Sequence, residues 1–445
     1  MDTKWHPTPR AGAGPLYLRL ADGIAHDIEA GRLPDGWRLP TVRAVAHRLG
    51  TTPGTVARAY AELGHRGLTS GEAGRGTFVR PTRGATSFEA PPDSAGKVVD
   101  LAGNYAAPPS STLLRELAGA WDQGSLATLV ATGGGEDPGV LGADYLDTFG
   151  LRVSTHQVLG TSGGQHALFV ALAALTRPGD RIAVDELANP GVRAAARLLR
   201  LRLVPVPHDG DGLHPDALPK QGVSVVVTTP TLHNPTGATM SADRRAELAD
   251  ALREHRLILL EDDPFAPLAA DAPPPVSSFA PERCVYLAST SKAVAPGLRL
   301  AFLSCPPALH DAMLAAARSS AWMPPSLVVD LVRRLVVDGL VTRLADSRRA
   351  ESVARLALVE QLLPTARRCG VGGAHAWVEL ADEWRGADLA ALGRVHGVSV
   401  APAGEFGGKR PGFRIGFGAP LSRHELARGL TAVDHMLATG PVVPR

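Results

Sequence analysis

The sequence predicts an α/β fold for most of the chain, preceded by a small helical module. A stretch dense in proline, glycine and serine, residues 81–97, reads as a flexible linker and divides the 445 residues into segments 1–80 and 98–445. In the longer segment, short apolar runs alternate with helical stretches, as buried parallel strands joined by helices do. In the shorter segment, two helical patterns are joined by a tight turn, which is typical of a helix-turn-helix.

Composition indicates a globular protein without a membrane anchor. Hydrophobic residues make up 44% of the chain and charged residues 20%, both ordinary for a soluble protein. There is no run of about 18 apolar residues and no apolar stretch after the basic residues of the N-terminus, so neither a spanning helix nor a secretory signal is expected. An odd number of scattered cysteines without metal-ligand spacing indicates a reducing, cytoplasmic location: Cys284, Cys305 and Cys369.

Positive charge is concentrated in the first segment. Residues 1–80 hold 11 Lys and Arg against 7 Asp and Glu, a net of +4, so the rest of the chain carries −2 within the total of +2. A basic module on a near-neutral body indicates that the module meets a polyanion.

Three helices and a hairpin are expected in the first segment. Apolar residues at helical spacing predict the first helix over 16–30, and the second covers 42–49. The third begins at Pro53, which suits the first helical position. Glycines on both sides of Arg75 predict the tip of a two-stranded hairpin. The expected cap residues of the second and third helices are Thr41, Gly50 and Thr52.

This segment resembles the GntR-type winged helix-turn-helix. The similarity runs from Pro15 to Val79 and includes GRLPDGWRLPTVRAVAHRLG, TVARAYAELGHRGL and GRGTFV. Pro53 stands where that family often has a polar or basic residue, so one DNA contact is expected to be missing. The alternative for the arginines is that they are solvated surface charges. The residues that the resemblance places at double-stranded operator DNA are Arg43, Thr52, Thr55, Arg58 and Gly76.

In the second segment a lysine follows a predicted buried strand. The motif is SxSK at 289–292, and Arg299 lies seven residues after Lys292. A lysine held in a pocket can lose its proton and attack an aldehyde carbon. An arginine at that distance can make a paired contact with a phosphate. Together they suggest a phosphorylated aldehyde as ligand.

Three further motifs fit the same ligand. TSGGQHAL (161–168) is a turn of small residues that opens a helix, whose free amides can bind an anion. HNPTG (233–237) follows a strand and presents the Asn234 amide to a phenolic oxygen. EDD (261–263) ends another strand, where a carboxylate can keep a pyridine nitrogen protonated. All lie where α/β sheets bind ligands, at the carboxyl ends of strands.

These four motifs, in this order, resemble those of the fold-type I aminotransferases, over residues 98–445. The resemblance implies a mainly parallel sheet, a smaller C-terminal α+β subdomain, and pyridoxal 5'-phosphate (PLP) as cofactor. It implies that Lys292 forms the internal aldimine, that Asp262 pairs with the ring nitrogen and that Asn234 bonds the 3'-oxygen. It also assigns Arg414, in FRIGF, to a ligand α-carboxylate. The residues implied for the phosphate are Gly164, Gln165, Ser289 and Arg299.

The sequence departs from that family at three places. Asn189 stands where an aromatic ring usually stacks on the cofactor, and Phe265 where a tyrosine bonds the 3'-oxygen. No tyrosine occurs near ATGGGEDPG (131–139), the segment from which a tyrosine normally reaches the other subunit of the dimer. Each lost hydrogen bond is worth about 1 kcal/mol, so weaker cofactor binding and poorer catalysis are expected.

Other interpretations remain open for single residues. Lys292 could be a surface lysine, and Asp262 a capping carboxylate, with Asp263 in its place if the register differs by one. Arg414 could form an interdomain ion pair. Two neighbours of the motifs, His233 and Glu261, are expected to be packed or structural.

The order of the two segments resembles the MocR subfamily of GntR regulators. This implies a PLP-dependent transcription regulator that acts as a homodimer and whose aminotransferase-like body senses PLP and an amino acid or amine. A working aminotransferase with an accessory DNA-binding domain is one alternative, and the departures argue against efficient turnover. A body that has lost PLP is another, and the joint presence of the motif residues argues against it. The target operon, the effector and the direction of regulation are not readable from the sequence.

Overall fold

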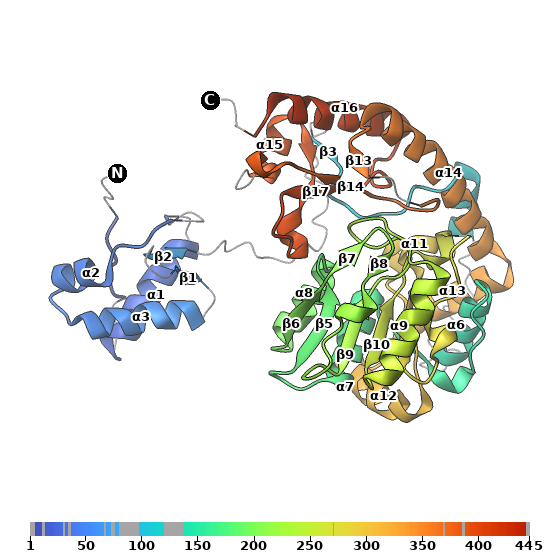
Figure 1. Cartoon of the computed structure of the whole chain (residues 1–445), viewed down its shortest axis with the longest axis horizontal. Coiled ribbons are helices and arrows are strands. Elements are labelled where there is room, and N and C mark those ends of the chain that lie inside the picture. The colour runs from blue at the N-terminus through green and yellow to red at the C-terminus, as the bar shows by residue number, and fades with distance from the viewer. Residues whose placement is uncertain are drawn as a thin grey trace. The chain divides into compact units, whose positions relative to one another are not determined.

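The chain forms two compact units, residues 1–88 and 89–445 (Figure 1). The predicted linker, 81–97, lies outside the described residues, and each unit is considered by itself. The computed structural model describes residues 5–10, 14–29, 32–33, 37–65, 68–72, 76–79, 98–119, 137–269, 271–367, 370–384 and 388–441.

The described part of the first unit is a helical core with a hairpin. Its elements are α1 (Leu16–Glu29), α2 (Val42–Leu49), α3 (Pro53–His65) and the antiparallel strands β1 (Thr69–Glu72) and β2 (Gly76–Val79). Leu20 and Ile24 of α1 pack with Val56 and Leu63 of α3, and all four are fully buried. The expected winged helix-turn-helix is thereby confirmed.

Cap residues fix where the helices of this unit begin and end. Thr41 accepts a hydrogen bond from Ala44 N at 3.3 Å, and Gly50 ends α2 in the left-handed conformation, φ 60°. The Thr52 hydroxyl accepts from Thr55 N at 3.2 Å at the start of α3. These side chains satisfy backbone groups that a helix end leaves unpaired, so the turn between α2 and α3 is short and defined.

The large lobe of the second unit is built on a seven-stranded sheet, in the order β4-β12-β11-β10-β9-β5-β6. The strands are β4 (Val158–Thr161), β5 (Arg181–Asp185), β6 (Arg202–Val206), β9 (Val225–Thr228), β10 (Ile258–Asp262), β11 (Cys284–Ser289) and β12 (Ala301–Ser304). β12 runs antiparallel to both its neighbours, and the other pairings are parallel. The sheet is therefore mainly parallel, as the resemblance implied.

Alternating residues of these strands supply two apolar layers. Val227 and Leu260 belong to one buried cluster with Leu168 of α7 (Gly164–Leu175). Their neighbours Val226 and Leu259 belong to another, with residues of α9 (Ala242–Glu254). Burial on both faces explains why these strands are continuous apolar runs. The other helices of this lobe are α4 (Ser111–Gly119), α6 (Pro138–Asp147), α8 (Pro190–Leu198), α10 (Val276–Phe279), α11 (Thr290–Ala293), α12 (Pro307–Ala321) and α13 (Ser326–Val337).

The small lobe is the expected C-terminal α+β subdomain. A four-stranded antiparallel sheet, in the order β13-β14-β17-β16, packs with α14 (Leu340–Leu362), α15 (Leu389–Val395) and α16 (Arg423–Thr439). The start of the unit belongs to this lobe, because β3 (Val99–Asp100) pairs with β15 (Val398–Ser399). Figure 1 shows β3 within the small lobe. Among the described helices, none is long and apolar enough to cross a bilayer. The remaining strands are β7 (His208–Asp209), β8 (Gly212–Leu213), β13 (Ala366–Arg367), β14 (Ala376–Glu379), β16 (Ala401–Pro402) and β17 (Gly412–Ile415).

Candidate functional site

Lys292 lies in the short helix α11, which directly follows the carboxyl end of β11 in the large sheet. Its amine donates a hydrogen bond to the main-chain carbonyl of Asn104. It also lies 5.3 Å from the centroid of the Phe265 ring and 6.0 Å from that of Tyr105. The side chain is half-buried. Lys292 is therefore packed among two rings and a carbonyl and does not extend freely into solvent.

Asp262, at the end of β10, is the carboxylate that faces this lysine. Burial raises its pKa to about 6, while Lys292 and a hydrogen bond from Asn189 act in the opposite direction. The neighbouring Asp263 accepts a hydrogen bond from Thr231 at 2.9 Å, and burial with the nearby Glu261 raises its pKa to about 8. Of the two carboxylates, Asp262 is thus the one whose pKa Lys292 lowers, whereas Asp263 is bonded to Thr231.

Asn189 has a defined contact in place of the expected stacking ring. Its Oδ1 accepts from Gly191 N at 2.9 Å and caps α8. That bond fixes the amide orientation, so the group that bonds Asp262 is the Nδ2 donor. The sequence indicated only a missing aromatic, whereas the structure shows a polar side chain held against Asp262.

An anion cradle lies at the start of α7. The helix begins at Gly164, and its N-cap residue Gly163, φ 93°, provides no side-chain cap. A Cβ on Gly163 would lie 2.6 Å from the Arg299 guanidinium, and one on Gly164 would lie 3.5 Å from the Ser289 hydroxyl. The backbone at the start of α7, the Arg299 guanidinium and the Ser289 hydroxyl therefore lie close together, an arrangement that suits a phosphate. Gln165 differs, because its side chain donates to Gly191 O at 3.0 Å and only its main chain adjoins the cradle.

Asn234 and Arg414 meet across the two lobes of the second unit. Arg414 Nη1, from β17 of the small lobe, donates to Asn234 Oδ1 at 2.7 Å, and both side chains are buried. Nη2 donates to the carbonyl of Ala102. His375 Nε2 lies 3.0 Å from the carbonyl of His233, and burial followed by the charge of Arg414 lowers the pKa of His375 to about 3. The arginine is thus at a contact between lobes, made with an amide oxygen.

Some residues around the lysine were not foreseen. Asn104 and Tyr105 come from the segment after β3, and His375 comes from the small lobe. They form no spaced motif, and the segment with Asn104 and Tyr105 follows β3, whose Val99 pairs with Val398, 299 residues away. Glu261 accepts from the amides of Val276 and Ser277 at 2.8 and 2.9 Å, in the structural role expected for it. Most of segment 131–139 lies outside the described residues.

The residues expected at DNA lie on α2, α3 and the hairpin. Arg43, Thr52 and Arg58 are exposed, and Thr55 is half-buried with its hydroxyl 2.9 Å from that of Thr52. The Arg58 guanidinium lies 4.4 Å over the ring of Tyr17, which holds it at the surface of α3. Gly76 has φ 125°, and a Cβ there would lie 2.9 Å from Arg38 Nε. Its neighbour Arg75 lies outside the described residues.

Fold and site together define a class of protein with a winged helix-turn-helix and an aminotransferase-type body. The profile of bacterial regulatory proteins of the gntR family matches residues 16–79, and that of aminotransferase class I and II matches residues 141–433. The chain belongs to the aminotransferase class I and II family over its larger part. With the DNA-binding module in front, it belongs to the MocR subfamily of GntR transcription regulators.

Two of the relatives are named as transcriptional regulators. The HTH-type transcriptional regulator YdeF of Bacillus subtilis is 27% identical, with 97% of this chain and 96% of that protein aligned. The pyridoxine biosynthesis transcriptional regulator PdxR of Corynebacterium glutamicum is 27% identical over 65% of this chain and 66% of its own. In structure, the α-aminoadipate aminotransferase LysN of Thermus thermophilus, complexed with N-(5'-phosphopyridoxyl)-L-leucine, superposes with a TM-score of 0.67. It is 26% identical over 77% of this chain and 94% of that chain.

Proposed function

We propose that this protein binds operator DNA as a homodimer and regulates transcription in response to PLP held in its body. One observation carries the cofactor part of the proposal. Lys292 and Asp262 lie near each other at the carboxyl ends of β11 and β10. Gly163 leaves room at the start of α7 for the Arg299 guanidinium. A Cβ at that glycine would lie 2.6 Å from the guanidinium, so glycine lets the arginine approach the first amides of α7, where an anion can bind.

The residues fit PLP group by group. When bound, PLP supplies an aldehyde that joins amines covalently and a ring that withdraws electrons from them. Lys292 would hold the aldehyde carbon, Asp262 the ring nitrogen and Asn234 the 3'-oxygen. Ser289, Arg299 and the amides from Gly164 and Gln165 would hold the phosphate. Arg414 would hold the carboxylate of an amino acid effector, since a guanidinium matches a carboxylate with two parallel bonds.

Two features favour regulation over catalysis. The stacking position holds Asn189, whose amide bonds Asp262, and the position expected for a tyrosine holds Phe265, whose ring is fully buried and offers no hydroxyl. YdeF, which aligns over nearly the whole chain, is named as a transcriptional regulator, and PdxR, which aligns over about two thirds of it, as a regulator of pyridoxine biosynthesis. We infer a vitamin B6 or amino acid signal for this chain as well.

The DNA part of the proposal depends on the first unit. Exposed Arg43 and Arg58, with the start of α3, present the basic surface that a major groove requires. A dimer supplies two such surfaces to two half-sites, which raises affinity without new contacts per module.

The test of the cofactor site is spectroscopic. Full-length protein incubated with PLP should show a visible band, and borohydride should fix the cofactor on the peptide that contains Lys292. K292A should lose both signals while its circular dichroism is unchanged, and K220A, at an exposed lysine of the same lobe, should keep them. Labelling of another lysine, or a band that survives in K292A, would overturn the assignment. Transamination of a panel of amino donors by wild-type protein would instead support the working aminotransferase.

A further inference from the structure

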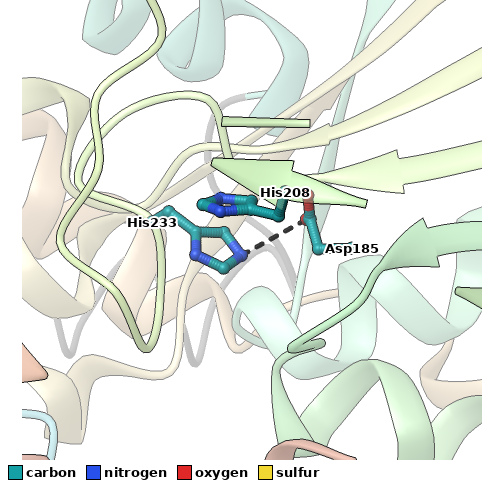
Figure 2. Close-up of side chains that lie close together, drawn as sticks. All are labelled: Asp185, His208 and His233. Atoms are coloured by element: carbon teal, nitrogen blue, oxygen red, sulfur yellow. Dashed lines mark ion pairs between the residues drawn. The ribbon is translucent and has the colours of Figure 1, made fainter. Parts of the chain in front are cut away.

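Three metal-ligand side chains converge beside the cofactor loop without a role in the site described above. Asp185 ends β5, His208 lies on β7, and His233 lies in the loop after β9 (Figure 2). One ligand atom from each lies within 4.8 Å of the others. Asp185 is 4% exposed and His233 2% exposed, and His208 is half-buried. Residues from three separate elements thus bring a carboxylate and two imidazoles to one point.

Two of the three are already at ligand spacing. His233 Nε2 lies 3.4 Å from Asp185 Oδ2. Zinc bonds of about 2.0–2.1 Å in a tetrahedron place neighbouring ligand atoms roughly 3.4 Å apart. The ring of His208 lies over that of His233, with centroids 4.2 Å apart and planes at 35°. For a ring nitrogen of His208 to bind the same ion, the ring must rotate out of this stacked position so that its edge faces the other two ligand atoms. It is the least buried of the three and lies on a two-residue strand, so it is the side chain best able to move.

Hydrogen bonds from outside orient the two buried ligands. The Thr228 hydroxyl donates to Asp185 Oδ1 at 3.0 Å, which leaves Oδ2 toward His233. His233 Nδ1 lies 2.9 Å from the Thr236 hydroxyl, which leaves Nε2 toward Asp185. Ligating histidines almost always have such a partner on their second ring nitrogen. The atoms left to bind a metal are Asp185 Oδ2 and His233 Nε2, and these two atoms face each other.

The charge of the cluster also suits a cation. Asp185 contributes a carboxylate that is only 4% exposed and that accepts a hydrogen bond from the Thr228 hydroxyl. A buried anion is stable only when a positive group lies close to it.

We propose that Asp185, His208 and His233 form a site for a divalent transition metal, with Zn²⁺ the expected ion. Imidazole nitrogens with one carboxylate oxygen are a donor set that zinc favours, and three protein ligands leave a fourth position for solvent or a ligand. The half-buried His208 marks the route of entry. None of the three is assigned to PLP. His233 precedes Asn234, so an ion there would stiffen the loop that carries this cofactor residue.

The test is metal binding by the full-length protein, with affinity tags removed and metal stripped by a chelator. Titration with ZnCl₂ in a calorimeter should give one site per chain, and CoCl₂ should give the strong visible bands of four-coordinate cobalt. H208A should weaken zinc binding by at least tenfold, and T228V should weaken it by about 10- to 100-fold through loss of ligand orientation. The matched control is H214A, which removes another half-buried imidazole, 3.0 Å from the Asp209 carboxylate, and should leave binding unchanged.

Because His208 is half-buried, H208A is expected to fold, and circular dichroism checks this. D185N should show the same loss of binding. The proposal is overturned if the wild-type protein gives no one-to-one isotherm with zinc. It is also overturned if H208A and D185N bind zinc as the wild type does. In either case Asp185 and His233 form a pair that binds no metal. The cofactor proposal is tested by a different signal, the visible absorbance band that depends on Lys292, so either proposal can fail without the other.

Discussion

Replacement of Asp262 by asparagine is expected to stabilise the cofactor-free protein. Burial raises the pKa of Asp262 from its ordinary value of 3.8 to about 6. The folded state therefore holds this proton more tightly than the unfolded chain, so ionisation costs stability. The cost is absent below about pH 4, grows as pH rises and reaches its full size above about pH 6. Because one pKa unit corresponds to about 1.4 kcal/mol, ionisation of Asp262 lowers the stability of the folded protein by roughly 3 kcal/mol. Asparagine avoids this cost and still accepts a hydrogen bond from Asn189.

The assay is urea unfolding of full-length, cofactor-free protein at pH 8 and pH 5, followed by tryptophan fluorescence. D262N should gain up to about 3 kcal/mol in the transition of the body at pH 8 and about half as much at pH 5. Its PLP affinity should fall by about 10- to 100-fold, because the charged partner of the ring nitrogen is lost. D216N, at an exposed aspartate, is the control. A D262N protein that is less stable at pH 8, or whose gain does not depend on pH, would show that ionised Asp262 does not destabilise the folded protein.

Three further variants probe the rest of the site and the DNA module. N189A removes the cap of α8 and the hydrogen bond to Asp262; it should lose about 1–2 kcal/mol in urea unfolding, and unchanged stability would contradict the cap. G163A forces a side chain at φ 93° against Arg299; it should weaken binding of PLP and of inorganic phosphate in parallel, and a loss for PLP alone would place the phosphate elsewhere. R58A should weaken DNA binding and lower the slope of log affinity against log salt by about 1, and an unchanged slope would mean that Arg58 makes no phosphate contact.

Much of the fold follows from local patterns. The caps at Thr41, Gly50 and Thr52 lie where the sequence placed them, because each satisfies backbone groups within a few residues. The apolar runs that end at Thr228, Asp262 and Ser289 became parallel strands with both faces covered, because burial on both sides selects continuous hydrophobic residues. Motifs at strand ends were then brought together by the sheet itself.

Parts of the site could not be predicted in this way. Asn104 and Tyr105 reach Lys292 only because β3 pairs with β15, and no local pattern encodes a partner so distant in sequence. Asn189 was recognised as a missing ring, but its bond to Asp262 depends on the cap geometry of α8. His208 lies between motifs, so its approach to His233 is visible only in three dimensions.

If this protein is a PLP-responsive regulator, the binding of PLP to the body and the binding of DNA to the first unit must affect each other. Coupling is reciprocal: if PLP changes DNA affinity by some factor, DNA must change PLP affinity by the same factor. The measurement is a PLP titration of full-length protein, with and without a two-half-site DNA selected from a random pool, at one fixed salt concentration because phosphate contacts dominate affinity. We expect the two PLP affinities to differ, and we expect K292A to abolish PLP binding in both conditions. Equal PLP affinities with and without the DNA would contradict a PLP-responsive regulator and leave the body as a dimerisation platform.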